Sequence, residues 1–290
     1  MLTKKRFALN RIISPSLTLE EFIKFAAARG LSQVELRNDL PGKTSAPNSI
    51  IDGLKPAEAL KIARGEGVRI ITINALQQFN LGDKRAACRA ELEQLLELAA
   101  AIECPAIVLC PNNNAADTRT PARKYLDTVD ALRDYGPLFV NYGVAGYVEA
   151  LGFGISSLAS LPAVVAAIKA SGYGCYRALL DTFHHYIGPD DQSIFGMDGL
   201  GASYEPAYTG LAHISGVEDD IPAEQFLDGN RVLVGPKDRM RNKELIQRLD
   251  TLGYQGTFSF EPFSPAVQKL PPDQLAAALE TSFAYLEIKI

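Results

Sequence analysis

The chain has 290 residues, of which 47% are hydrophobic, and its formal net charge is −5 at pH 7. This length allows one α/β barrel of ordinary size around a large buried core. The negative charge argues against a nucleic-acid partner, and no apolar run reaches the roughly eighteen residues of a membrane span. Four cysteines without CxxC spacing are typical of reduced thiols, so we expect a cytoplasmic protein.

Short apolar runs of strand type alternate with amphipathic segments along the whole chain. The runs predicted as strands are 6–10, 33–37, 68–74, 106–110, 146–149, 177–180, 210–213 and 257–260. Helices are predicted over 18–29, 56–65, 84–102, 121–134, 161–171, 242–252 and 272–287. The segment 188–208, rich in Gly, Asp and Pro, holds at most a short helix.

Eight strands with intervening helices predict a fold of the α/β class. No GxGxxG fingerprint follows the first strand, which favours a closed (β/α)8 barrel, or TIM barrel, over an open doubly wound sheet. We expect residues 1–290 to form this barrel as a single domain. The active sites of such barrels lie at the carboxyl ends of the strands.

Four successive predicted strands end on residues that can bind a metal ion. Glu149, Asp181 and His213 are spaced 32 residues apart, which is about one βα unit, and Glu261 follows after 48 residues. A single acidic residue after a strand is more often a turn residue or a helix cap. Three carboxylates that converge without a cation would repel one another, so the four residues together predict one metal site. One imidazole and three carboxylates suit Mn, Mg, Co or Zn.

Several motifs resemble those of a known protein family. The segments 149–153, 181–184 and 253–263, together with His213, resemble the xylose-isomerase-like TIM-barrel superfamily of sugar isomerases and epimerases. Within it, the chain is most similar to inosose isomerases (2-keto-myo-inositol isomerases) of inositol catabolism, which it also resembles at 34–37, 73–76, 218–222 and 228–232. One loop departs from the family pattern. Its Trp-Pro-Gly-x-Gly is replaced by Val-Gly-Pro-Lys-Asp at 234–238, and the chain contains no Trp.

The resemblance implies that the four strand-end residues hold a single divalent cation and that the substrate is a small polyol or sugar. Polar substrate contacts are then expected from His184 and Arg231, with Glu35, Arg37 and Asn74 as further candidates from the first strands. The alternative is that Arg231 caps the following turn and that His184 packs beneath the loop. His185, next to His184, is expected to be structural.

The ligand set also indicates the chemistry. A cation with open positions can bind a ketone oxygen and the neighbouring hydroxyl, and can stabilise the enediolate that forms when the C–H between them loses its proton. Carbonyl migration then needs one base and one acid, for which Glu149 and Glu261 are the candidates. We expect proton transfer over a hydride shift, because the strand ends supply ligands for one metal ion.

Other functions fit the same residues or the same scaffold. A ketose 3-epimerase or an inosose dehydratase would use the same residues, and a non-catalytic sugar-binding barrel would keep the scaffold alone. An apurinic endonuclease shares the predicted fold, but its three-zinc cluster needs more than the three histidines of this chain. The expected partner is a small molecule, with no nucleic acid and no membrane, and a homo-oligomer remains open.

Overall fold

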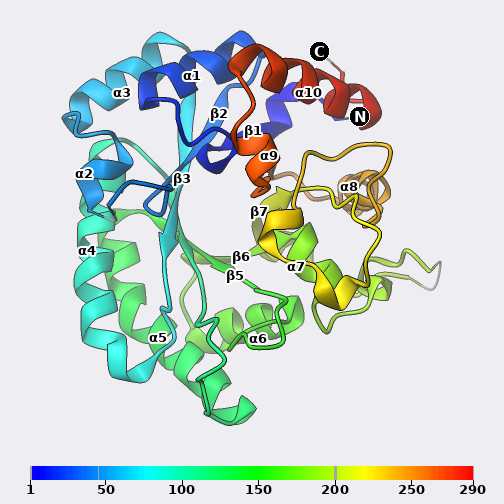
Figure 1. Cartoon of the computed structure of the whole chain (residues 1–290). Helices are drawn as coiled ribbons and strands as arrows, with labels where there is room; N and C mark the ends of the chain where they lie inside the picture. The colour runs from blue at the N-terminus through cyan, green and yellow to red at the C-terminus, as the bar shows by residue number, and fades with distance from the viewer. Residues whose placement is uncertain (1, 45, 199–200, 290) are drawn as a thin grey trace.

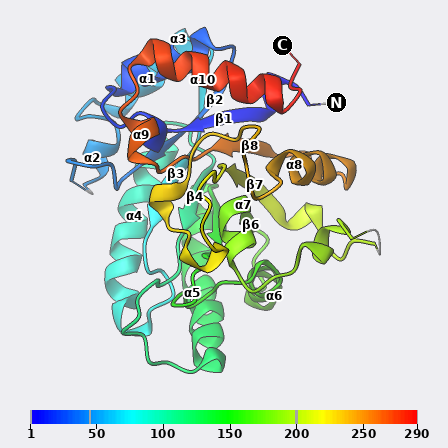
Figure 2. The same cartoon turned by 45° about the vertical axis from the view of Figure 1, so that its right-hand side comes forward.

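The eight strands form one closed barrel, which confirms the predicted fold. The computed structural model describes residues 2–44, 46–198 and 201–289. Neighbouring strands are parallel and run in the order β1 to β8, and β8 pairs with β1 to close the barrel (Figures 1 and 2). The strands are β1 (Phe7–Asn10), β2 (Gln33–Arg37), β3 (Arg69–Leu76), β4 (Ala106–Leu109), β5 (Ala145–Glu149), β6 (Tyr176–Asp181), β7 (Thr209–Ile214) and β8 (Thr257–Phe260).

The longer helices surround the barrel and the shorter ones lie where strands end (Figure 1). The surrounding helices are α1 (Leu19–Ala28), α3 (Pro56–Gly65), α4 (Arg85–Ala101), α5 (Pro121–Tyr142), α6 (Leu161–Ser171), α8 (Asn242–Thr251) and α10 (Pro272–Tyr285). The short helices that follow β2, β6 and β8 are α2 (Pro47–Ile50), α7 (Thr182–Ile187) and α9 (Pro265–Gln268).

Alternation along the strands separates two apolar layers. Outward-facing residues such as Leu9, Val34 and Phe258 join the large core between barrel and helices. Inward-facing residues form a smaller core inside the barrel, made of Ala8, Ile71, Ala75, Val108, Cys110, Leu179 and Leu211. Polar residues that continue the inward positions at the strand ends therefore meet above this inner core.

Helix α5 is longer than the sequence pattern predicts. The sequence predicts a helix over 121–134, but the helix continues through Pro137 to Tyr142 and ends at Gly143, whose φ is 65°. Tyr135 and Phe139 are fully buried, and the Tyr135 hydroxyl donates a hydrogen bond to the Phe79 carbonyl at 3.2 Å. This packing outweighs the cost of a proline inside a helix.

The segment 188–208 and the chain directly after β6 both contain more helix than the sequence predicts. Within the described part of that segment there are two short 3-10 helices, Gln192–Phe195 and Pro206–Tyr208. Immediately after β6 the chain forms the unpredicted helix α7, whose N-cap is Asp181. The two ends of the chain lie side by side, where Thr3 pairs with Lys289 (Figure 2). Among the residues described, no helix is long and apolar enough to cross a membrane.

Candidate metal centre

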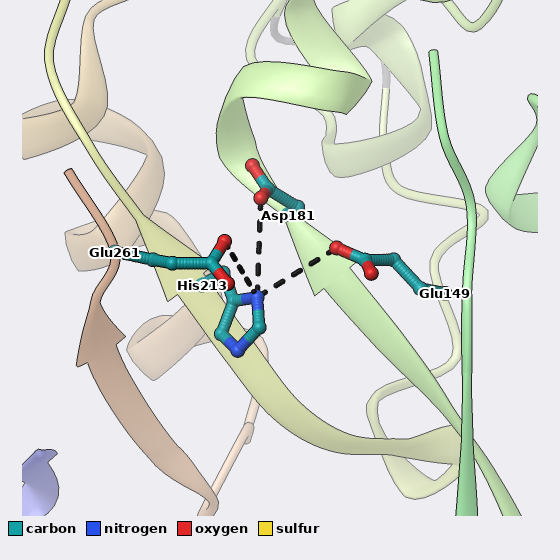
Figure 3. Close-up of side chains that lie close together, drawn as sticks. All are labelled: Glu149, Asp181, His213 and Glu261. Atoms are coloured by element: carbon teal, nitrogen blue, oxygen red, sulfur yellow. Dashed lines mark ion pairs between the residues drawn. The ribbon is translucent and has the colours of Figure 1, made fainter. Parts of the chain in front are cut away.

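Four side chains gather at the carboxyl ends of β5, β6, β7 and β8, namely those of Glu149, Asp181, His213 and Glu261. One ligand atom from each residue lies within 4.8 Å of the ligand atoms of the other three, and all four residues are buried. Strand register contributes to this arrangement because Asp181 of β6 is paired with His213 of β7. Figure 3 shows the three carboxylates approaching the His213 ring from different sides.

His213 lies at the centre of this group. Its Nδ1 is 3.0 Å from Glu261, 3.6 Å from Glu149 and 3.9 Å from Asp181, yet it is buried and makes no hydrogen bond. Its Nε2 lies 3.1 Å from a carboxylate oxygen of Glu35. Because an ionised carboxylate only accepts, Nε2 carries a proton, and in the neutral imidazole that a metal ion requires the lone pair of Nδ1 faces the other three carboxylates. This is the orientation that a metal-binding histidine requires.

The charges of the three carboxylates also favour a cation beside His213 Nδ1. Burial alone would lower the pKa of His213, but the charges of Glu261 and Glu35 outweigh burial and raise this pKa well above its ordinary value. Burial would likewise raise the pKa of Glu261, but His213 and Arg231 hold it well below its ordinary value. For Asp181 burial prevails, and its pKa is raised. A divalent cation beside Nδ1 would supply the missing charge, so the four residues fit a metal ion in both geometry and chemistry.

Arg231 lies directly against this group. Its Nη2 donates to Asp181 at 2.6 Å and to Glu261 at 2.8 Å, and its Nε donates to the Ser215 hydroxyl at 3.0 Å. Its Nη1 donates to Asp228 at 3.2 Å, and Arg231 as a whole is 1% exposed. The structure thus places Arg231 among the candidate ligands, where it neutralises part of their charge.

The two adjacent histidines of α7 lie in different surroundings. His184 is buried between the rings of Phe153 and Phe183, with centroid distances of 5.1 and 5.4 Å, and its Nδ1 has no hydrogen-bond partner. Burial, and then the charge of Arg231, lower the pKa of His184 to about 4, so its imidazole is neutral at pH 7. His185 packs against Phe195 at 4.8 Å, which agrees with a structural role.

The three further candidates from the first strands are all buried near the group. Glu35 contacts His213 Nε2 and accepts a short hydrogen bond from the Thr72 hydroxyl, so it lies on the Nε2 side of the imidazole ring. Arg37 and Asn74 donate to Glu261 at 2.5 and 3.3 Å. The structure therefore brings all nine predicted site residues into one connected region.

Sequence reasoning missed two residues of this region. Asn10, at the end of β1, donates to Glu261 at 3.1 Å, and the Cys110 thiol, just after β4, donates to Glu149 at 3.2 Å. Burial raises the pKa of the Cys110 thiol well above its ordinary value, so it stays protonated. Both residues occupy inward positions at the end of a predicted strand, which is the signal that could have identified them.

The barrel agrees with the comparisons with known proteins. Residues 23–286 match the model of the family described as Xylose isomerase-like TIM barrel, and the chain belongs to this family. No curated protein matches the chain. A xylose isomerase domain containing protein from Salmonella typhimurium LT2 is 33% identical, with 99% of both chains covered and a TM-score of 0.88.

Two further solved structures share the fold. An IolI protein with a bound zinc atom is 17% identical, with 97% of this chain and 98% of that chain covered and a TM-score of 0.83. D-Psicose 3-epimerase from Clostridium cellulolyticum H10, solved with D-tagatose, is also 17% identical, with 97% and 99% covered and a TM-score of 0.73. At this level of identity the two likenesses show the fold alone.

Proposed function

We propose that this protein is a divalent-metal-dependent isomerase of a small cyclic polyol ketone or sugar, such as an inosose, and that it works by proton transfer. The observation that carries this proposal is the convergence of four buried ligand atoms within 4.8 Å, around a His213 Nδ1 that has no hydrogen-bond partner. The zinc atom in the IolI protein and the D-tagatose in the epimerase structure support a metal and a sugar-sized substrate in this fold.

Glu149 and Glu261 are the proposed acid and base. A bound cation would polarise a ketone oxygen and the neighbouring hydroxyl, which makes the C–H between them acidic. Glu149 comes from β5 and Glu261 follows β8, and the two carboxylates approach from different sides of His213 (Figure 3). One carboxylate can therefore remove a proton from one carbon while the other returns a proton to the adjacent carbon.

Arg231 and Arg37 already donate hydrogen bonds to groups of the protein, which favours a neutral substrate over a sugar phosphate or an acid. Arg231 donates through Nε, Nη1 and Nη2 to Ser215 and to the carboxylates around it. Arg37 also donates through all three nitrogens, to Asp39 and Glu261. An anionic group on the substrate would have to compete with these carboxylates, whereas hydroxyls can bind beside the neutral His184 imidazole.

Metal analysis combined with turnover in D2O tests this proposal. We expect about one divalent ion per chain, turnover of an inosose, and solvent deuterium at the carbon that receives the proton. Glu149→Gln should lose turnover by about 10²- to 10⁴-fold, which is more than it loses metal affinity. Complete retention of the substrate hydrogen over many turnovers would point to a hydride shift instead.

The same assay separates the alternatives. Turnover of a ketohexose alone would identify a ketose 3-epimerase, and loss of water from the inosose would identify a dehydratase. A protein that binds the metal and is inert on both substrates would be a non-catalytic sugar-binding barrel.

A further inference from the structure

We propose that Asn10, Arg37 and Asn74 are positioning residues that hold the Glu261 carboxylate in one orientation, so that it presents a single oxygen to the metal centre. The inference deepens the proposed function, because it concerns the same site. It assigns Arg37 and Asn74 a task that differs from direct substrate contact, and it adds Asn10.

The two oxygens of Glu261 have separate partners. Oε1 accepts hydrogen bonds from Arg37 Nη1 at 2.5 Å, from Asn10 Nδ2 at 3.1 Å and from Asn74 Nδ2 at 3.3 Å. Oε2 accepts from Arg231 at 2.8 Å and lies 3.0 Å from His213 Nδ1. Three donors therefore occupy one oxygen, and the other oxygen faces the cluster.

The three donors are themselves fixed in place. They end or lie within β1, β2 and β3 and are at most 4% exposed. Arg37 donates to both carboxylate oxygens of Asp39, at 2.7 and 2.8 Å, and its guanidinium lies 5.0 Å from the Phe263 ring. The planar guanidinium thus spans two carboxylates with a defined geometry, which a more flexible ammonium group cannot reproduce.

The amide of Asn10 is also held at both ends. Its Oδ1 accepts a hydrogen bond from the backbone N–H of Ile12 at 3.1 Å, which leaves its Nδ2 to donate to Glu261. Arg37 Nη1 additionally approaches Asn10 Oδ1 at 3.4 Å. The donors thus support one another, and a rotation of the Glu261 carboxylate would break three hydrogen bonds at once.

We expect these hydrogen bonds to Glu261 to affect the metal affinity of the site. Residues that orient a metal ligand through a hydrogen bond typically change metal affinity by about 10- to 100-fold when they are removed. A residue that only contacts the substrate would instead change KM and leave the metal affinity of the substrate-free protein unchanged.

The test is the affinity of substrate-free protein for Mn²⁺, measured by competition with a chelating dye, together with kcat and KM. Arg37→Gln should weaken Mn²⁺ binding by about 10- to 100-fold and lower kcat more than it raises KM. Arg37→Lys should recover part of the loss, because its ammonium can still donate to Oε1. Arg64→Gln, which alters an exposed arginine paired with the exposed Glu103, is the matched control and should behave as wild type.

A second variant keeps the test valid if Arg37→Gln does not fold. Asp39 is 38% exposed in its side chain, so Asp39→Asn should fold and should weaken Mn²⁺ binding in the same direction but less. Unchanged Mn²⁺ affinity in the folded variants, with a raised KM, would overturn the positioning role and favour substrate contact.

The outcome also separates this inference from the proposed function. Weaker Mn²⁺ binding in Arg37→Gln, with a wild type that is inert on every substrate, would support the positioning role and reject the isomerase. A wild type that turns over substrate while Arg37→Gln keeps its Mn²⁺ affinity would reject only the positioning role. A wild type that binds no Mn²⁺, Mg²⁺, Co²⁺ or Zn²⁺ would overturn both.

Discussion

Asp181 uses its two carboxylate oxygens for different tasks. Oδ1 accepts hydrogen bonds from the backbone N–H groups of Phe183 at 2.7 Å and His184 at 3.3 Å, and so caps α7. Oδ2 accepts from Arg231 at 2.6 Å and faces His213 Nδ1 at 3.9 Å. The cap and the charged ligand can therefore be removed separately.

Asp181→Asn should weaken divalent-cation binding because it removes a charged ligand, while its amide oxygen can still cap α7. Asp181→Ala should lose the cap as well, which lowers the free energy of unfolding by about 1 kcal/mol relative to Asp181→Asn. Metal content and urea unfolding of the two variants measure the two effects. Metal content that is equal in wild type and Asp181→Asn would contradict the single-site model.

His184 and Arg231 are both predicted substrate contacts, but their surroundings predict that replacing them by alanine has different effects. Arg231→Ala removes the buried arginine that pairs with both Asp181 and Glu261, so we expect a loss of about 3–5 kcal/mol in the free energy of unfolding. His184→Ala should keep the metal and lose about 2–4 kcal/mol of transition-state stabilisation. Tm and kcat/KM, measured together for each variant, distinguish a loss of stability from a loss of transition-state stabilisation. A His184→Ala protein with a lowered Tm and wild-type kcat/KM would show that the ring only fills space between Phe153 and Phe183.

At the scale of elements, the loop after β5 packs tightly against α7. A Cβ on Gly152 would lie 1.9 Å from the carbonyl oxygen of His184, so only glycine allows this approach. The contact helps to place α7, and with it His184, over the end of the barrel.

Gly152→Ala should therefore displace the loop or α7 and lower the free energy of unfolding by about 1–3 kcal/mol. Gly154→Ala is the matched control, since a Cβ at Gly154 meets nothing within 4 Å. We expect a lower Tm and lower kcat/KM for Gly152→Ala only. Equal Tm values for the two variants would mean that the loop relaxes without cost.

Asp117 connects the loop after β4 to the start of α5. Its carboxylate accepts hydrogen bonds from Arg119 at 2.7 and 2.9 Å and from the Asn112 amide at 2.9 Å. The Arg119 hydrogen bonds are the main cause that lowers the pKa of Asp117. Arg119 also donates to Asp127 of α5 at 2.7 Å, which completes the connection.

This arrangement predicts a pH dependence of stability. Because the pKa of Asp117 is lower in the folded protein than in the unfolded chain, acid protonates the unfolded chain first and favours unfolding. Asp117→Asn should lower the free energy of unfolding by about 1–3 kcal/mol at pH 7, and its difference from wild type should shrink as the pH falls below about 4. Urea unfolding at about pH 7 and about pH 3 measures this difference.

The control for this pH effect is Asp130→Asn. The Asp130 side chain is 54% exposed and lies 3.9 Å from Arg133, so its loss should change stability little at either pH. A gap between wild type and Asp117→Asn that is the same at both pH values would contradict the assignment to Asp117.

At the scale of the whole molecule, the proposed metal would join four successive strand ends, β5 to β8. A ligand that binds only the folded state stabilises it, by about 2.7 kcal/mol when its concentration is 100 times Kd. We therefore expect added Mn²⁺ to raise Tm, a chelator to reverse the rise, and Asp181→Asn to show a much smaller rise. A Tm that is insensitive to every divalent cation would argue against the centre.

The barrel and the family could be predicted from the sequence because their signals are local. The alternation of apolar residues, as in Val34 and Leu36 of β2, and the motif that ends on Glu261 are properties of short segments. Local signals failed where distant packing decides the outcome. Helix α5 continues past Pro137 because Tyr135 is buried and donates a hydrogen bond to the carbonyl of Phe79, 56 residues away.

The sequence by itself determined which residues end the strands, and hence which side chains are available to a metal centre. Only the tertiary structure decided what each of them contacts. Arg37 and Asn10 meet Glu261 across 224 and 251 residues of chain, because β1 pairs with β8 when the barrel closes. No local sequence pattern predicts that the barrel closes. The direction of a buried guanidinium depends on all of its hydrogen-bond partners together. The separate surroundings of the two Glu261 oxygens therefore follow from the closed barrel.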